Sequence, residues 1–190
     1  MRTPLLLAVL AVASLATAET PQPAESTQPA ETTRPAASPK EEAASSGGAT
    51  VGAAAPALSI TGPDGAVTSE SLAGKPVVLA FWATWDKASP RLLEALDALH
   101  REHAGAGLVV LSTSVDDGRN KHKVAPYVAG RGHTYPVHYD TSGANLTRWS
   151  GESRPGFYAV IGKDGTVVHL GRETTPEALA SLASAARGAL

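Results

Sequence analysis

The 190-residue sequence contains no cysteine. Disulfide bonds and thiolate nucleophiles are therefore excluded for this polypeptide, so its stability must come from an apolar core. Neither sign of charge dominates, because 16 Lys and Arg stand against 18 Asp and Glu, a formal net charge of −2. Without a basic excess or an acidic block, no nucleic-acid partner is expected.

Residues 1–18 have the pattern of an export signal. Arg2 precedes the apolar stretch 5–15, which is too short to cross the ~30 Å hydrocarbon core of a bilayer as a helix. The Ala-Thr-Ala at 16–18 is a small-x-small cleavage pattern, which predicts a mature chain that starts at Glu19. We expect a periplasmic or secreted protein, which contacts a membrane only if the signal peptide stays uncleaved.

Residues 19–50 are predicted to form a disordered linker. Prolines alternate there with Ala, Glu, Ser, Thr and Gln, and there is no aromatic residue and no aliphatic residue larger than alanine. Such a composition cannot bury enough apolar surface to offset the entropy lost on ordering. We interpret the segment as a tether for one folded domain at residues 51–190.

Apolar runs and helical patterns alternate within the predicted domain. Gly-Pro-Asp-Gly at 62–65 and Gly-Lys-Asp-Gly at 162–165 indicate two hairpin turns. We expect strands at 58–61, 66–68, 77–82, 108–115, 137–139, 158–161 and 166–170. We expect helices at 92–103, at 121–130 with an interruption by Pro126, at 145–149, and at 176–186 with Thr175 as N-cap. This order predicts an α/β domain with a mixed central sheet, helices on both faces and an N-terminal hairpin.

Four segments carry a resemblance to a known family: Gly52 to Pro56, Phe81-Trp-Ala-Thr-Trp85, Leu108 to Asp116, and Arg154-Pro155 before 157–161. They resemble the periplasmic TlpA/ResA-type thiol–disulfide oxidoreductases and the related redoxin, or AhpC/TSA, group. The first segment is similar to the family's opening segment, and the second to the lead into its redox motif. The third is similar to the strand after the family's first helix, and the fourth to the segment that carries its cis-proline. The resemblance implies a thioredoxin fold.

The chain departs from that family at its two reactive positions. The family has Trp-Cys-x-x-Cys where this sequence has Trp85-Asp86-Lys87-Ala88-Ser89. Thiol–disulfide exchange requires a thiolate, so redox catalysis by this polypeptide alone is excluded even though the resembled family is one of oxidoreductases. We expect no catalytic residue of the family type and no cofactor.

Asp86 and Ser89 allow two other interpretations. Either residue could cap the helix that follows, since Asp and Ser are favoured at N-caps and Pro90 suits a first helical turn. Alternatively, Ser89 could act as a nucleophile, for which Lys87 is the only nearby candidate base. We favour the capping interpretation.

The resemblance also implies a shallow groove for an extended peptide. Trp85, Lys87 and Ala88 would form one side of this groove, and Arg154 and Pro155 the other. Trp82 is expected to pack in the core, whereas Trp85 could pack or border the groove.

Three functions remain open from the sequence. The first is a non-catalytic module that binds an extended peptide or an envelope protein. The second is an enzyme that uses Asp86 or Ser89, and the third is a structural component of an envelope assembly. No metal site is predicted, because His100 and His103 have a suitable spacing but lack a third ligand nearby.

Overall fold

The structure is a computed structural model that describes residues 48–190, so the predicted signal peptide (1–18) and nearly all of the predicted linker (19–50) lie outside the described residues. The strands are β1 (Ser59–Gly62), β2 (Gly65–Thr68), β3 (Val77–Trp82), β4 (Val109–Ser114), β5 (Val137–Tyr139), β6 (Phe157–Ile161) and β7 (Val167–Gly171). The helices are η1 (Glu70–Leu72), α1 (Ser89–His103), η2 (Ala104–Ala106), α2 (Lys121–Ala129), α3 (Ala144–Ser150) and α4 (Pro176–Gly188). None of the helices in this part of the chain is both long and apolar enough to span a membrane.

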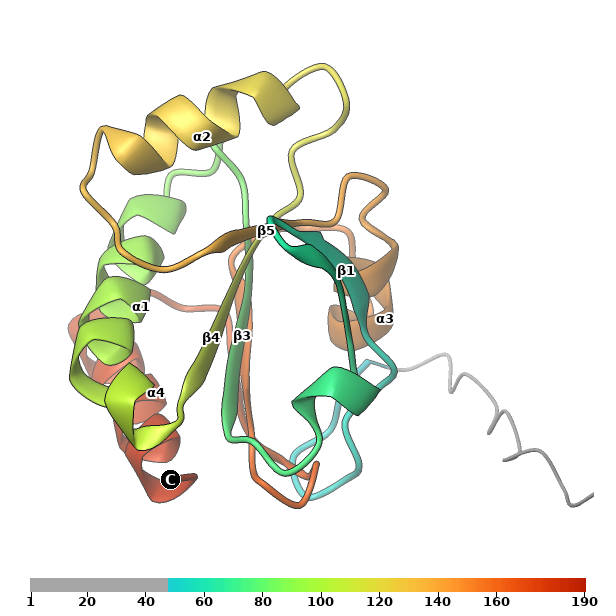
Figure 1. The fold of residues 1–190 in the computed structure, drawn as a ribbon, viewed down its shortest axis with the longest axis vertical. Coiled ribbons are helices and arrows are strands. Elements are labelled where there is room, and N and C mark those ends of the chain that lie inside the picture. Colours follow the sequence, from blue (N-terminus) through green and yellow to red (C-terminus); the bar gives the residue numbers. More distant parts are fainter. Residues whose placement is uncertain (1–47) are drawn as a thin grey trace, which may run out of the picture. The chain divides into compact units, whose positions relative to one another are not determined.

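The strands form one sheet in the order β2-β1-β5-β4-β3-β6-β7 (Figure 1). The central strands β3, β4 and β5 are parallel, and the outer pairings are antiparallel. α1 and α4 lie on one face of the sheet and α3 lies on the other (Figure 1). The predicted mixed sheet with helices on both faces and an N-terminal hairpin is therefore confirmed.

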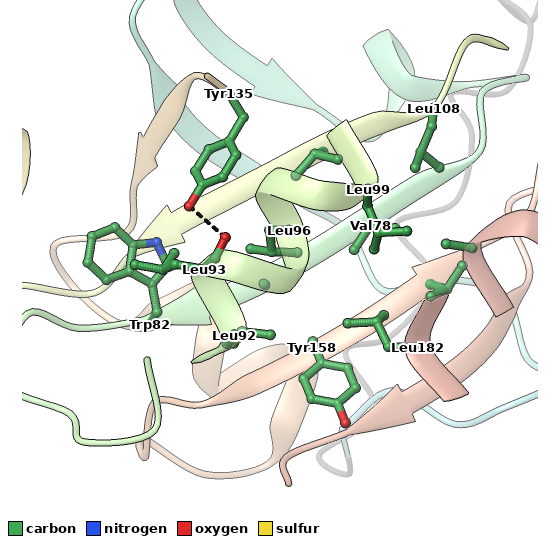
Figure 2. Packing of buried hydrophobic residues seen from close by; sticks show 14 of the residues in the cluster. Val78, Trp82, Leu92, Leu93, Leu96, Leu99, Leu108, Tyr135, Tyr158 and Leu182 are labelled. Atoms are coloured by element: carbon green, nitrogen blue, oxygen red, sulfur yellow. Dashed lines mark hydrogen bonds between the residues drawn. The ribbon is translucent and has the colours of Figure 1, made fainter. Parts of the chain in front are cut away.

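β3 forms the centre of the core and is buried along its whole length. Because successive side chains of a strand point to opposite faces, β3 contributes to two separate apolar clusters. Val78, Ala80 and Trp82 pack beneath α1 and α4, and Val77, Leu79 and Phe81 pack on the side of α3. The leucines of α1 that recur at helical spacing complete the first cluster (Figure 2): Leu92, Leu93, Leu96 and Leu99 are at most 3% exposed.

The helix α2 continues through Pro126, so the predicted interruption at this residue is wrong. A proline inside a helix removes one N–H donor, here the one that would bond to the His122 carbonyl. Val124 and Val128, on either side of the proline, are buried in the cluster beneath α1. This burial on both sides of the proline explains why a short helix tolerates the lost hydrogen bond.

His133, in the loop before β5, is half-buried as a residue, but its side chain is only 4% exposed. Its ring stacks on Tyr135 with a centroid distance of 5.3 Å, and its Nδ1 lies 3.9 Å from Asp97 Oδ1. Burial lowers the pKa of His133 below its ordinary value of 6.5, and the Asp97 carboxylate offsets only part of that shift. Burial likewise lowers the pKa of His138 and of His169.

We expect the free energy of unfolding to decrease as the pH falls from 7 towards 5. The unfolded chain binds protons on these histidines near the ordinary pKa of 6.5, whereas the folded chain does so only at lower pH. Stability that is present above pH 6.5 is therefore lost progressively below it. Urea unfolding at a series of pH values measures this slope.

The variant His133→Phe keeps a ring on Tyr135 and removes one titrating group, so it should reduce the slope. The matched change His122→Phe, on the exposed side of α2, adds the same phenyl ring without removing a buried imidazole, so the slope of His133→Phe should be the smaller of the two. An unaltered slope in His133→Phe would show that burial of this ring does not couple proton uptake to unfolding.

Candidate functional site

The candidate site lies where β3 ends and the chain turns into α1. Trp82, the last residue of β3, is fully buried, stacks on Tyr127 and donates its indole N–H to Ser112 Oγ over 2.9 Å. Trp85, three residues later, is 63% exposed. Trp82 therefore packs as predicted, whereas Trp85 contributes its indole to the surface.

A buried carboxylate fixes the corner that carries Trp85. Asp116, just after β4, has no exposed surface and accepts hydrogen bonds from the Thr84 N–H at 2.9 Å, the Thr84 hydroxyl at 2.6 Å and the Ser114 hydroxyl at 2.9 Å. Neither Thr84 nor Asp116 was singled out from the sequence. The signal in the sequence is that a polar residue follows each of two apolar strands, Thr84 after β3 and Asp116 after β4. In the structure these strands are parallel neighbours, with Trp82 paired with Ser114 at their carboxyl ends.

Asp86 and Ser89 occupy the positions of the resembled family's cysteines, and their side chains bond to each other. The Ser89 hydroxyl donates to Asp86 Oδ2 over 2.7 Å and accepts from the Ala83 N–H at 3.3 Å. α1 begins at Ser89, after Ala88, and no side chain caps its first turn. The prediction that Asp86 or Ser89 caps the helix is therefore wrong, because Ser89 is buried against the preceding loop and the two polar groups satisfy each other.

The arrangement of Ser89 does not suit nucleophilic chemistry. Its hydroxyl has no exposed surface, so a substrate carbonyl could not reach it without movement of the chain. Lys87, the base considered from the sequence, is exposed and makes no hydrogen bond to Ser89 within residues 48–190. In the same part of the chain, no group of three or more His, Asp or Glu side chains is arranged to hold a metal ion. His100 and His103 therefore belong to no such group there.

The loop before β6 lies directly against this corner. Gly156 donates its N–H to the Phe81 carbonyl over 2.8 Å, and a Cβ placed on Gly156 would be 3.8 Å from Asp86 Oδ2. Gly156 has a φ of +82°, which favours glycine at this close approach. Of the two residues predicted from this loop, Arg154 is exposed and Pro155 is buried. The structure thus places the loop that carries Arg154 and Pro155 beside the corner that carries Asp86.

Among the residues that the structure describes, the Arg154 carbonyl accepts a hydrogen bond but the Arg154 N–H donates none. The carbonyl accepts from Arg172 Nη1 over 3.0 Å, and this guanidinium also lies 3.5 Å from Glu152 Oε2. Within residues 48–190 the Arg154 N–H donates to no group. Since a carbonyl oxygen has two lone pairs, the Arg154 backbone could still both donate to and accept from an added strand.

Comparisons with known proteins agree with this arrangement. A model of the AhpC/TSA family matches residues 51–170. Thioredoxin-like protein YneN of Bacillus subtilis (strain 168) is 28% identical over 106 residues, which are 55% of this chain and 61% of that protein. The match therefore spans less than two thirds of the length of that relative.

Three solved structures share the fold. The first is a proposed protein disulfide isomerase from Bacteroides thetaiotaomicron, with a TM-score of 0.67, 26% identity, and coverage of 75% of this chain and 91% of that one. The second is a proposed thiol:disulfide interchange protein DsbE from Chlorobium tepidum, with a TM-score of 0.66, 19% identity, and coverage of 74% and 98%. The third is the pneumococcal exposed lipoprotein thioredoxin Etrx1 from Streptococcus pneumoniae strain TIGR4, with a TM-score of 0.55, 24% identity, and coverage of 68% and 98%. These likenesses confirm the predicted thioredoxin fold.

Proposed function

The chain belongs to the AhpC/TSA family, and from this membership we propose that it is a redox-inactive thioredoxin-like module that binds an extended peptide or protein segment without covalent capture. Its 190 residues include no cysteine, and Asp86 and Ser89 stand at the family's reactive positions. Neither an oxygen nucleophile nor a carboxylate can replace a thiolate in disulfide exchange. Noncovalent binding of a peptide does not require a cysteine, so this function remains possible for the chain.

The exposed Trp85 is the observation that carries this proposal. An indole that is 63% exposed makes little contribution to the core, yet it sits on a corner that the buried Asp116 holds in place. Tryptophan is enriched among residues that dominate binding energy, and a rigid anchor loses little entropy on binding. Arg154 supports the same site, because its N–H, which donates to no group among residues 48–190, could pair with an extended chain, and its side chain is exposed.

Export and tethering are also part of the proposal. The signal pattern of residues 1–18 would direct the chain out of the cytoplasm, and the proline-rich segment 19–50 would let the folded domain reach a partner at a distance. The likeness to an exposed lipoprotein thioredoxin is in keeping with such a location. The proposed partner is accordingly an unfolded or extended segment of an envelope protein.

Fluorescence anisotropy can test the proposed binding. The probe is a fluorescein-labelled, reduced and carboxymethylated α-lactalbumin, which stays unfolded, titrated with the full chain. We expect Trp85→Ala to weaken binding at least about tenfold and Arg154→Ala about threefold, as for a central anchor and a peripheral contact.

The control variant is Val168→Ala on β7, since Val168 is also an exposed apolar residue but lies outside the proposed groove. It should bind as the unsubstituted chain does. The proposal fails if the unsubstituted chain does not bind the probe, or if Trp85→Ala and Val168→Ala bind equally well.

A further inference from the structure

A cavity of about 130 Å³ lies at the opposite end of β3 from Trp85. Val77, the first residue of β3, lines it, together with residues from the segment before β1, from η1, from α3 and from the β6–β7 turn. Leu58, Val77, Trp149 and Ile161 form an apolar floor and are at most 8% exposed. The cavity is thus an apolar pocket that is separate from the proposed groove.

Side-chain hydrogen bonds hold the wall of this cavity that η1 provides. The Ser69 hydroxyl accepts from the Leu58 N–H at 2.7 Å. The Ser71 hydroxyl donates to the Thr68 carbonyl over 2.7 Å and accepts from the Thr68 N–H at 3.1 Å. η1 contributes no fully buried residue, although its Leu72 is partly buried against the apolar cluster that forms the floor, so these bonds act together with that packing to position η1.

Lys75 is the one charged side chain among the described residues that line the cavity. Its ammonium donates to the Ser71 carbonyl over 3.0 Å and forms no ion pair within residues 48–190. An ammonium has three donors, so two remain for a ligand. An uncompensated cation at the rim of an apolar pocket favours a ligand with an anionic head and an apolar body.

We propose that this cavity binds a small aromatic carboxylate, with the ring against the apolar floor and the carboxylate on Lys75. An apolar cavity of about 150 Å³ can hold one benzene ring, so about 130 Å³ limits the ligand to a single ring or a branched chain of similar size. The ion pair with Lys75 distinguishes a carboxylate from a neutral molecule of the same shape. This inference does not rest on the proposed peptide groove.

Benzoate is the probe, and amide chemical shifts of the 15N-labelled full chain are the measurement. We expect saturable shifts at Gly74, Gly162 and Gly165, which line the cavity, with a Kd of about 1 mM for a ligand of this size. Lys75→Met keeps the apolar stem and should weaken benzoate about fivefold, and benzyl alcohol should bind the unsubstituted chain about fivefold more weakly than benzoate.

Two further variants separate this site from its surroundings. Ala55→Leu and Leu72→Phe each add volume to the lining and should abolish the benzoate shifts, whereas Trp85→Ala should leave them intact. No saturable shift at these glycines overturns the proposal. Shifts that are equal for benzoate and benzyl alcohol, or unaffected by Lys75→Met, overturn the assignment of a carboxylate. None of these results bears on the anisotropy assay with Trp85→Ala, so the two proposals can fail independently.

Discussion

The double variant Asp86→Cys with Ser89→Cys should accelerate the reduction of insulin by dithiothreitol, whereas the unsubstituted chain should stay at background. The Ser89 hydroxyl and the Asp86 carboxylate bond to each other over 2.7 Å, so the two side chains point towards each other and cysteines at these positions would be oriented to form a disulfide. A thiol at position 86 would lie near the amino end of α1, which lowers a thiol pKa and favours the thiolate. We expect a rate at least about tenfold above background, a difference of about 1.4 kcal/mol in activation free energy.

The single variants are the controls for this experiment. Asp86→Cys alone could attack a disulfide but would lack a second thiol to release the mixed disulfide, and Ser89→Cys alone would bury its thiol. Both should stay near background. If the double variant folds and forms its internal disulfide but still does not reduce insulin, then the missing cysteines are not the sole reason why this chain lacks reductase activity. Acceleration by the unsubstituted chain would refute the redox-inactive assignment.

The variant Asp116→Ala should lower the free energy of unfolding by about 3–5 kcal/mol. It removes the acceptor for three donors, two on the half-buried Thr84 and one on the fully buried Ser114. Each buried donor left without a partner costs about 1–3 kcal/mol, less any relaxation of the chain. Against a typical total of about 5–15 kcal/mol this is a large loss, and we expect the Tm to fall by about 10 °C or more.

Asp117→Ala is the matched control, because Asp117 is the adjacent acid but is exposed, and its carboxylate accepts only from Arg119 and Asn120 within residues 48–190. It should cost about 1 kcal/mol or less. Asp116→Asn, which keeps one acceptor oxygen, should fall between the two. Equal unfolding free energies for Asp116→Ala and Asp117→Ala would show that the buried network contributes little to stability.

The sequence predicts the elements of this fold well where burial leaves a regular pattern. The bounds of β3 and β5 match the predicted 77–82 and 137–139. For β3 the reason is that a strand covered on both faces is a continuous apolar run between polar or turn residues. Thr175 caps α4 as predicted, since its hydroxyl accepts from the Ala178 N–H, a contact three residues away. Local chemistry of this kind is visible in one sequence.

Contacts between distant segments are not visible in the same way. The bond between Thr84 and Asp116 joins residues 32 positions apart and depends on the parallel register of β3 and β4, which periodicity does not specify. The capping prediction for Asp86 failed for a related reason. It assumed that the Asp86 carboxylate would accept from the N–H groups of the first turn of α1. In the structure this carboxylate accepts instead from the hydroxyl of Ser89, which is buried.

The hydrogen bond between Asp86 and Ser89 has a consequence for how this chain could evolve. Exchanging Ser89 alone for cysteine replaces the hydroxyl that bonds to the Asp86 carboxylate and the Ala83 N–H with a thiol, a weaker donor and acceptor, and exchanging Asp86 alone leaves the buried Ser89 hydroxyl without its carboxylate acceptor. A return to thiol chemistry through single substitutions would therefore pass through a less stable intermediate that has no redox activity to offset its cost. The bond between Asp86 and Ser89 therefore disfavours stepwise substitution of this pair by two cysteines.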